Sequence, residues 1–216
     1  MKKIWMAWLA GLLLSPVYAG ENPDKNWTEA VELFRALEKS FSEVRTVQAR
    51  FTEEKKIAIL DRVLHMEGRM ALEIPGKLAW RVEKPLRYKL TLKGREAFQW
   101  DEETRRVQRI PLAGNPVLEG VLSQMQQWFS GQFASLQADY DVQIISASPP
   151  QMAFRPRADR GVAKVIRRIE IRIQADGRYV EQIEMEDVSG DLTTIRFHDT
   201  VLNAPVDPSE WEAVPR

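Results

Sequence analysis

The segment from Gly68 to Trp100 constrains the fold of this chain more than any other part of the sequence. Within it, apolar and polar residues alternate in short runs, which Pro75-Gly76, Lys84-Pro85 and Lys93-Gly94 separate. Alternation with a period of two is typical of strands that bury one face, and connections this short join antiparallel neighbours. The segment therefore predicts an antiparallel meander with a single apolar face.

The same alternation continues on both sides of this segment. It begins at Val47, and it returns from Tyr140 to Phe197 with hairpin turns at Asp176-Gly177 and Ser189-Gly190. Dipeptides of this kind between alternating runs are strong hairpin signals. The whole chain then holds about eleven strands.

Two stretches with helical spacing interrupt the strands. The first starts at a cap, Asn26 or Thr28, and repeats apolar residues at intervals of three and four as far as Val44. The second opens at Asn115-Pro116, where Asn suits the cap and Pro the first turn, and ends near Gly131. The expected fold class is mainly β with a helical lid (α+β), a curved sheet that two or three helices cover.

The first nineteen residues have the pattern of a secretory signal peptide. Lys2 and Lys3 precede an apolar run over residues 4–14, and Val17-Tyr18-Ala19 offers a cleavage site after Ala19. We expect residues 20–216 to form one exported domain. The chain has no cysteine, which suits the bacterial periplasm better than the disulfide-rich animal extracellular space.

The charged residues offer little chemistry. The 31 basic and 31 acidic residues balance, so we expect no nucleic-acid partner. His65 and His198 lie far apart in expected strands, and Asp187 and Asp191 flank a turn glycine as solvated carboxylates commonly do. The run from Glu53 to Lys56 has the pattern of charge pairing on an exposed strand end. With no nucleophile elbow, phosphate loop or zinc spacing, we predict no enzyme, no cofactor and no metal.

The apolar face of the sheet leaves two alternatives open. Trp80, Phe98 and Trp100 can pack under the helices as an ordinary core, which is the commoner use of such residues. A strongly curved sheet with few helices can also leave its concave side incompletely filled. An apolar hollow of that kind would suit a lipid chain.

Six segments share the order and spacing of a known family: Phe51-Thr52-Glu53, Gly68-Arg69-Met70, Pro75 to Trp80, Pro85, Gly94 followed by Phe98 and Trp100, and Asp187 to Phe197. On these segments the chain resembles the LolA family, periplasmic carriers of lipoproteins between the inner and outer membranes of Gram-negative bacteria. The resemblance implies an unclosed antiparallel β-barrel whose helices form a lid. It also implies that acyl chains of a lipoprotein sit in the hollow between the sheet and the lid.

The resemblance and the alternating pattern together name the residues of the expected site. Carried over by position, the residues facing the hollow are Leu72, Leu78, Trp80 and Val82. The alternating pattern adds Leu90, Phe98 and Trp100. The expected lid residues are Phe34, Leu37, Leu122 and Met125.

One position departs from the family pattern. The residue before the family's Pro is an Arg that hydrogen-bonds to the lid, and Ile74 stands there in this chain. An apolar side chain cannot donate to lid carbonyls, and the sequence leaves open whether Arg81, Arg87 or another cation replaces the contact.

The expected partners follow from the same resemblance. They are a lipoprotein or another acylated lipid as cargo, an inner-membrane exporter and an outer-membrane acceptor, with the carrier itself a monomer. Gly114-Asn115-Pro116 resembles LolA-like proteins that work beside lipid exporters of the resistance-nodulation-division type, so a polyene or other lipid is an alternative cargo. A structural or sensory domain without a lipid is the alternative outside the carrier class.

Overall fold

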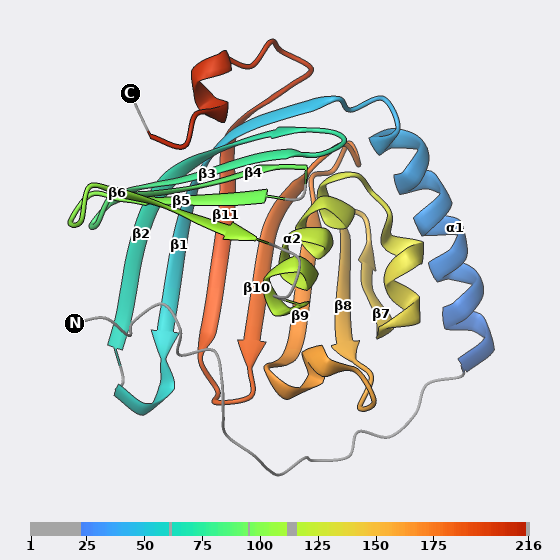
Figure 1. Cartoon of the computed structure of the whole chain (residues 1–216). Helices are drawn as coiled ribbons and strands as arrows, with labels where there is room; N and C mark the ends of the chain where they lie inside the picture. The colour runs from blue at the N-terminus through green and yellow to red at the C-terminus, as the bar shows by residue number, and fades with distance from the viewer. Residues whose placement is uncertain (1–22, 61, 95, 112–115, 215–216) are drawn as a thin grey trace.

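A single antiparallel sheet of eleven strands organises the computed structural model, in the order β6-β5-β4-β3-β2-β1-β11-β10-β9-β8-β7 (Figure 1). The structure describes residues 23–60, 62–94, 96–111 and 116–214, without the side chains of residues 23–30 and 116–122. The strands are β1 (Thr46–Ile57), β2 (Arg62–Glu73), β3 (Lys77–Lys84), β4 (Tyr88–Lys93), β5 (Glu96–Asp101), β6 (Arg106–Pro111), β7 (Tyr140–Ala147), β8 (Pro150–Pro156), β9 (Ile166–Ile173), β10 (Val180–Asp187) and β11 (Leu192–Leu202).

The helices explain why the sheet has two free edges. α1 (Pro23–Phe41) precedes the first strand, while α2 (Pro116–Phe129) and the short helix η2 (Phe133–Ala138) separate β6 from β7. Because nearly every strand pairs with its neighbour in the chain, this insertion leaves β6 and β7 at opposite edges, and β1 pairs with β11 in the middle. The expected unclosed, eleven-stranded antiparallel fold is confirmed.

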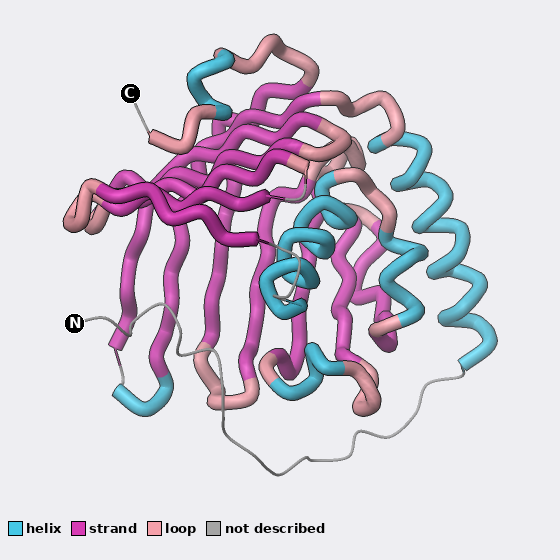
Figure 2. The backbone as a smooth tube through the Cα atoms, in the orientation of Figure 1, coloured by secondary structure: helices cyan, strands magenta, loops and turns pink. Residues whose placement is uncertain are grey.

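The sheet is strongly curved. Strands β3 to β6 turn away from β2 and cross over one half of the sheet, while α2 lies inside the curve and α1 runs along the β7 side (Figures 1 and 2). We call the side that carries α2 the concave face and the opposite side the outer face. No helix in the described part of the chain has both the length and the apolar character needed to cross a bilayer.

Gly68 allows β1, β2 and β3 to approach one another closely. It pairs with Phe51 on one side and Val82 on the other, at a register irregularity between β2 and β3. A Cβ atom built on Gly68 would lie 2.1 Å from the carbonyl oxygen of Arg81 and 2.5 Å from the ring of Phe51. Only glycine fits here, because the Phe51 ring occupies the place where a side chain would stand.

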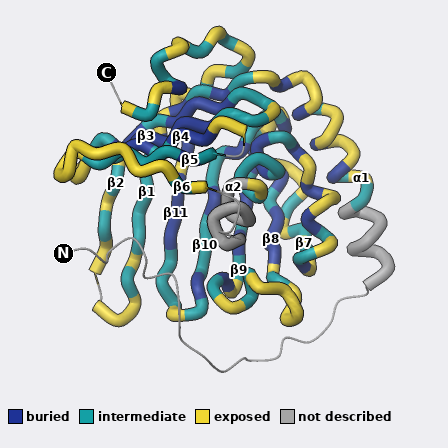
Figure 3. The backbone as a smooth tube through the Cα atoms, viewed as in Figure 1, coloured by how far each residue is buried: buried dark blue, intermediate teal, exposed yellow. Residues whose placement is uncertain are grey.

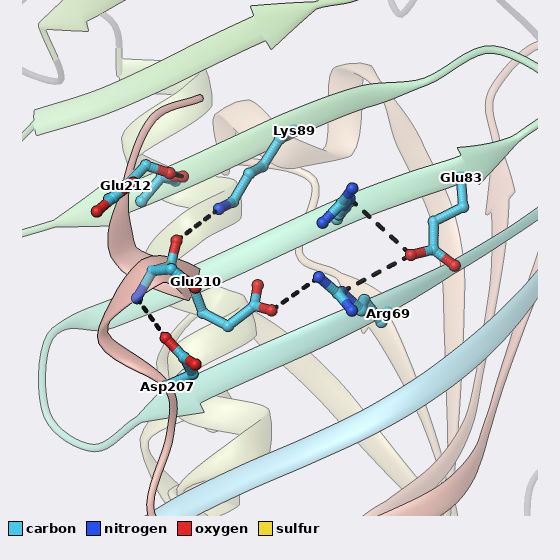
Figure 4. Close-up of polar contacts among 9 residues, drawn as sticks. Arg69, Glu83, Lys89, Asp207, Glu210 and Glu212 are labelled. Carbon is cyan, nitrogen blue, oxygen red and sulfur yellow. Dashed lines mark hydrogen bonds and ion pairs between the residues drawn. The ribbon is translucent and has the colours of Figure 1, made fainter. Parts of the chain in front are cut away.

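The C-terminal segment, residues 203–214, covers the outer face of β2, β3 and β4. Arg69 forms an ion pair of 2.9 Å with Glu210, and the amine of Lys89 lies 3.4 Å from the carbonyl of Ser209 (Figure 4). Trp211 is buried against Ala71 and Ala79. Both faces of β3 are therefore covered, which explains why Leu78 to Val82 is buried without a break.

We predict that Gly68→Ala lowers the free energy of unfolding by about 2 to 3 kcal/mol, as overpacking of a dense site does. The new methyl group would overlap a backbone carbonyl and a buried ring, and neither can move freely. Gly161→Ala is the matched control, because nothing lies within 4 Å of the Cβ it would add. Urea denaturation of both variants measures the difference, and equal stability of the two would contradict this explanation of Gly68.

Candidate functional site

Four aromatic side chains, Phe51, Trp80, Phe129 and Phe197, form a cluster at the centre of the concave face. The rings of Phe51 and Trp80 stack with centroids 4.0 Å apart, and Phe197 meets Trp80 edge-on at 6.1 Å. Phe129 of α2 meets Phe197 edge-on at 5.3 Å. Edge-to-face and offset stacking at these distances are favourable. We call these four residues the aromatic cluster; it attaches α2 to the sheet.

The register accounts for most of the residues expected to face the hollow. Leu72 pairs with Leu78, Trp80 pairs with Leu90, and Gly68 pairs with Val82. Directly opposite residues share a face of a sheet, so these side chains lie on the concave face with Trp80. Leu72, Leu78 and Val82 are buried in the core, whereas Leu90 is half-buried beside it.

Phe98 and Trp100 do not share this face, and the expectation that they do is wrong. Phe98 pairs with Thr91 and Trp100 with Lys89, whose side chains point to the C-terminal segment on the outer face. The concave positions of β5 are held by residues such as Ala97, which pairs with Leu92. The reason is the tight β4–β5 turn, in which Lys93 pairs with Glu96. Because faces alternate along a strand, this pairing places Ala97 on the concave face and turns Phe98 and Trp100 to the outer face.

The expected lid residues occupy two different places. Phe34 and Leu37 are buried on α1, where Phe34 stacks on Phe133 of η2 with centroids 6.4 Å apart. They pack near the β7 side of the sheet. Met125 is half-buried on α2 and contacts the core. The side chain of Leu122 lies outside the described residues.

Ile74 contributes apolar packing where the family pattern has a cation. Its side chain is half-buried against the main core, and its amide donates to the carbonyl of Arg45 at 2.8 Å. Arg81 points to the outer face, where burial and the neighbouring Arg69 lower its pKa. Arg87 pairs with Glu102 at 3.1 Å. Neither arginine takes the place of the family's lid contact among the described residues.

Half-buried apolar side chains on the concave face and on α2 pack against the core that contains the aromatic cluster. We call them the rim: Met66, Tyr88, Leu90, Met125 and Met185. Burial is densest where β3 and β4 cross over the sheet, and it decreases along the lower parts of β1 and β2 (Figure 3). The concave face thus grades from a dry aromatic centre to an apolar rim that remains partly accessible.

Two charged residues, Glu53 and Lys55, also lie on the concave face. They follow Phe51 at alternate positions on β1, and Glu53 pairs with Met66 on one side and Ile195 on the other. Lys55 forms an ion pair of 3.4 Å with Asp191. The expectation of an exposed strand end is therefore wrong for Glu53. Continuing the alternation beyond Phe51 would have identified both residues.

Burial dominates the electrostatics of Glu53. It raises the pKa of this carboxyl to about 7, against the opposing effect of the Lys55 charge. The pKa of Tyr88 on β4 is raised as well, first by its own burial and then by the negative charge of Glu53. The indole of Trp80 donates a hydrogen bond to Tyr88, which connects the Glu53 environment to the aromatic cluster.

The remaining polar candidates have structural roles or lie at the surface. His65 and His198 are exposed on β2 and β11. Asp187 is buried, contrary to the solvated turn carboxylate expected, and accepts backbone hydrogen bonds from Ser189 and Asp191 at 2.9 and 3.0 Å. Within the described residues, no group of three His, Cys, Asp or Glu side chains is placed to hold a metal ion.

A cavity of about 250 Å³ lies on the other side of the sheet. Its lining includes Arg50 and Arg69 of the outer face and Glu210 of the C-terminal segment. Its lining is partly charged and partly apolar, and it includes none of the four residues of the aromatic cluster. Among the described residues, the concave face is the stronger candidate, because it combines apolar side chains with a helix that packs on them.

Comparison with known proteins places the chain in a family. The family model described as outer membrane lipoprotein carrier protein LolA matches residues 42–213. An outer-membrane lipoprotein carrier protein of Chromohalobacter salexigens is 24% identical over 151 residues, which cover 69% of this chain and 67% of the relative. The protein described in the same words from Alkalilimnicola ehrlichii is 23% identical over 186 residues, covering 83% and 78%.

Solved structures share the fold at lower identity. MucB superposes with a TM-score of 0.50 at 13% identity, covering 86% of this chain and 62% of MucB. A LolA superfamily protein from Nitrosomonas europaea has a TM-score of 0.43 at 10% identity, covering 82% and 94%. The likeness to MucB is one of fold alone.

We predict that Glu53→Gln is more stable than the unmodified chain above pH 7 and equally stable below pH 4. The folded chain holds a proton on Glu53 up to pH 7, whereas the unfolded chain loses it near pH 4.5, so stability falls as the pH rises between these values. The loss reaches about 3 kcal/mol, at 1.36 kcal/mol per unit of pKa. Denaturation curves from pH 4 to 8 measure it.

The neighbouring Glu54→Gln is the control for this prediction. Glu54 lies on the outer face, where it pairs with Arg196 at 3.3 Å. We expect the free energy of unfolding of Glu54→Gln, relative to that of the unmodified chain, not to increase with pH. If the free energy of unfolding of Glu53→Gln differs from that of the unmodified chain by the same amount at every pH, the carboxyl is solvated and the prediction is wrong.

Proposed function

Because the chain belongs to the LolA family of outer membrane lipoprotein carrier proteins, we propose that its concave face holds the acyl chains of a lipoprotein during transport between the two membranes. The family is one of periplasmic, non-enzymatic carriers. The cargo-binding residues of the proposal are Leu72, Leu78, Trp80, Val82 and Leu90, with Met125 on the lid. Phe98 and Trp100 are left out because they lie on the outer face.

One observation carries the proposal: the apolar rim remains partly accessible around a buried aromatic centre. Met66, Leu90 and Met185 contact the core and yet keep part of their surface exposed. A monomeric protein gains little from leaving such side chains half-covered beside its core. An acyl chain laid along the rim would complete their burial, at about 0.8 kcal/mol for each methylene removed from water.

Opening of the lid would break aromatic packing. The described contacts of α2 with the sheet include Phe129 on Phe197, and a close polar contact joins Gln124 to Tyr140 of β7. Ile74 offers no hydrogen bond to the lid from its side chain. Acyl chains of the cargo can take the place of Phe129 in packing against Phe197. Because both contacts are apolar, the lid can open with a small change in free energy.

The route of the carrier follows from its family. The opening nineteen residues would direct export and be removed after Ala19, and an inner-membrane exporter would load residues 20–216, which act as one domain and as a monomer. An outer-membrane acceptor would then receive the cargo. The carrier needs no energy source of its own if the acceptor binds acyl chains more tightly.

A carrier of another acylated lipid is the second candidate, and the apolar Ile74 at the family's lid-contact position favours it. Extraction of the protein purified from its native host, followed by lipid mass spectrometry, separates the two. A triacylated peptide supports the lipoprotein cargo, and another amphiphile supports the second candidate. A protein that carries no lipid and binds no apolar dye would refute both.

We predict that Leu90→Asp weakens binding of the apolar dye diphenylhexatriene by at least about tenfold, since a carboxylate on the rim must stay hydrated. Leu86→Asp is the matched control: Leu86 lies just before the same strand and is 67% exposed. Fluorescence titration measures both affinities, and thermal melts check that both variants fold. Equal binding by the two variants would argue against the concave face as the site.

A further inference from the structure

The carboxyl of Glu53 lies between apolar side chains on the concave face. Its neighbours in register are Met66 and Ile195, and Phe51 precedes it on the same face of β1. No described residue donates a hydrogen bond to it. The cation nearest in sequence on this face, Lys55, lowers the pKa of Glu53 through its charge and forms an ion pair of 3.4 Å with Asp191.

A half-buried carboxyl in this position is costly to the fold. Partial burial between Met66 and Ile195 disfavours the charged form of the carboxyl, and no described residue offsets this with a hydrogen bond. Methionine would fill the same space beside Met66 without this cost. A group kept where it destabilises the folded state is a candidate for function.

The position of Glu53 matches the boundary that a bound amphiphile would have. Towards the dry centre lie Phe51 and Trp80, stacked at 4.0 Å. Away from it, β1 continues on the same face through Lys55 to Ile57, and residues 58–60 beyond the strand are exposed. Acyl chains against the aromatic cluster would therefore bring the first polar group of the amphiphile level with Glu53.

We propose that the Glu53 carboxyl accepts a hydrogen bond from the cargo, and that this cargo carries an N–H donor, such as an amide, directly beside an acyl chain. The inference rests on the proposed function, because it assumes that the concave face holds acyl chains. Tyr88 faces the same space from β4 and bears a hydrogen bond from Trp80, so its hydroxyl adds polarity at the same depth. Above pH 7, where the Glu53 carboxyl is ionised and can only accept, an ester linkage at this depth would offer it no donor.

Two matched ligands test the proposal, N-methyldodecanamide and methyl dodecanoate, which differ only in N–H against O. Each displaces diphenylhexatriene from the full-length mature protein at pH 8.5, where Glu53 is ionised, and the ratio of the two affinities is compared among variants. We expect the ratio to favour the amide about tenfold more in the unmodified chain than in Glu53→Met, which removes the acceptor. Glu53→Gln keeps a carbonyl acceptor and should restore part of the preference.

The control is Glu54→Met, which alters the adjacent residue on the outer face and should leave the ratio unchanged. Thermal melts confirm that each variant is folded, and Glu53→Met should melt no lower than the unmodified chain. A ratio that is the same within twofold in the unmodified chain and in Glu53→Met overturns the proposal while the carrier function stands. Failure of the unmodified chain to bind dye and both ligands overturns the carrier function and this inference together.

Discussion

The stack of Phe51 on Trp80, over a glycine, is the contact on which the rest of the structure depends. Gly68 leaves room for the Phe51 ring between β2 and its neighbours, and the ring then lies against Trp80 at 4.0 Å. This contact joins three consecutive strands where the sheet begins to fold over itself. Phe197 extends the packing to the second half of the sheet. This packing joins the two halves of the curved sheet on its concave face.

A sheet bent in this way must be supported on both sides. On the concave face the support is α2, through Phe129. On the outer face it is the C-terminal segment, where Trp211 is buried and Glu210 neutralises Arg69 at 2.9 Å. The two supports differ in chemistry. Aromatic packing on the inside can be exchanged for acyl chains, whereas the ion pairs outside have no such substitute, so the outer support is suited to remain while the inner one moves.

The sequence predicted the fold more fully than it predicted the site, and the turns explain the difference. Alternation alone places Leu78, Trp80 and Val82 on one face, because a run of strand has a single phase. Alternation does not predict which residues of the next strand lie on the same face unless the number of turn residues is known. The pairing of Lys93 with Glu96 reverses the face that hydrophobicity suggests for Phe98 and Trp100. The bulk of these aromatic residues made them resemble core, but they lie beside strand residues that the C-terminal segment contacts.

Glu53 shows the opposite error: because it is charged, the sequence suggests an exposed residue, although it lies on the concave face. Four successive charged residues after Thr52 resemble a solvated end, yet the strand keeps its phase and carries Glu53 onto the concave face. An apolar face alone would hold any acyl chain with an affinity set by its length. A single acceptor on that face changes little in affinity, but it distinguishes cargoes by the group that joins chain to head. Selectivity in a container of this kind therefore depends on its least apolar residue.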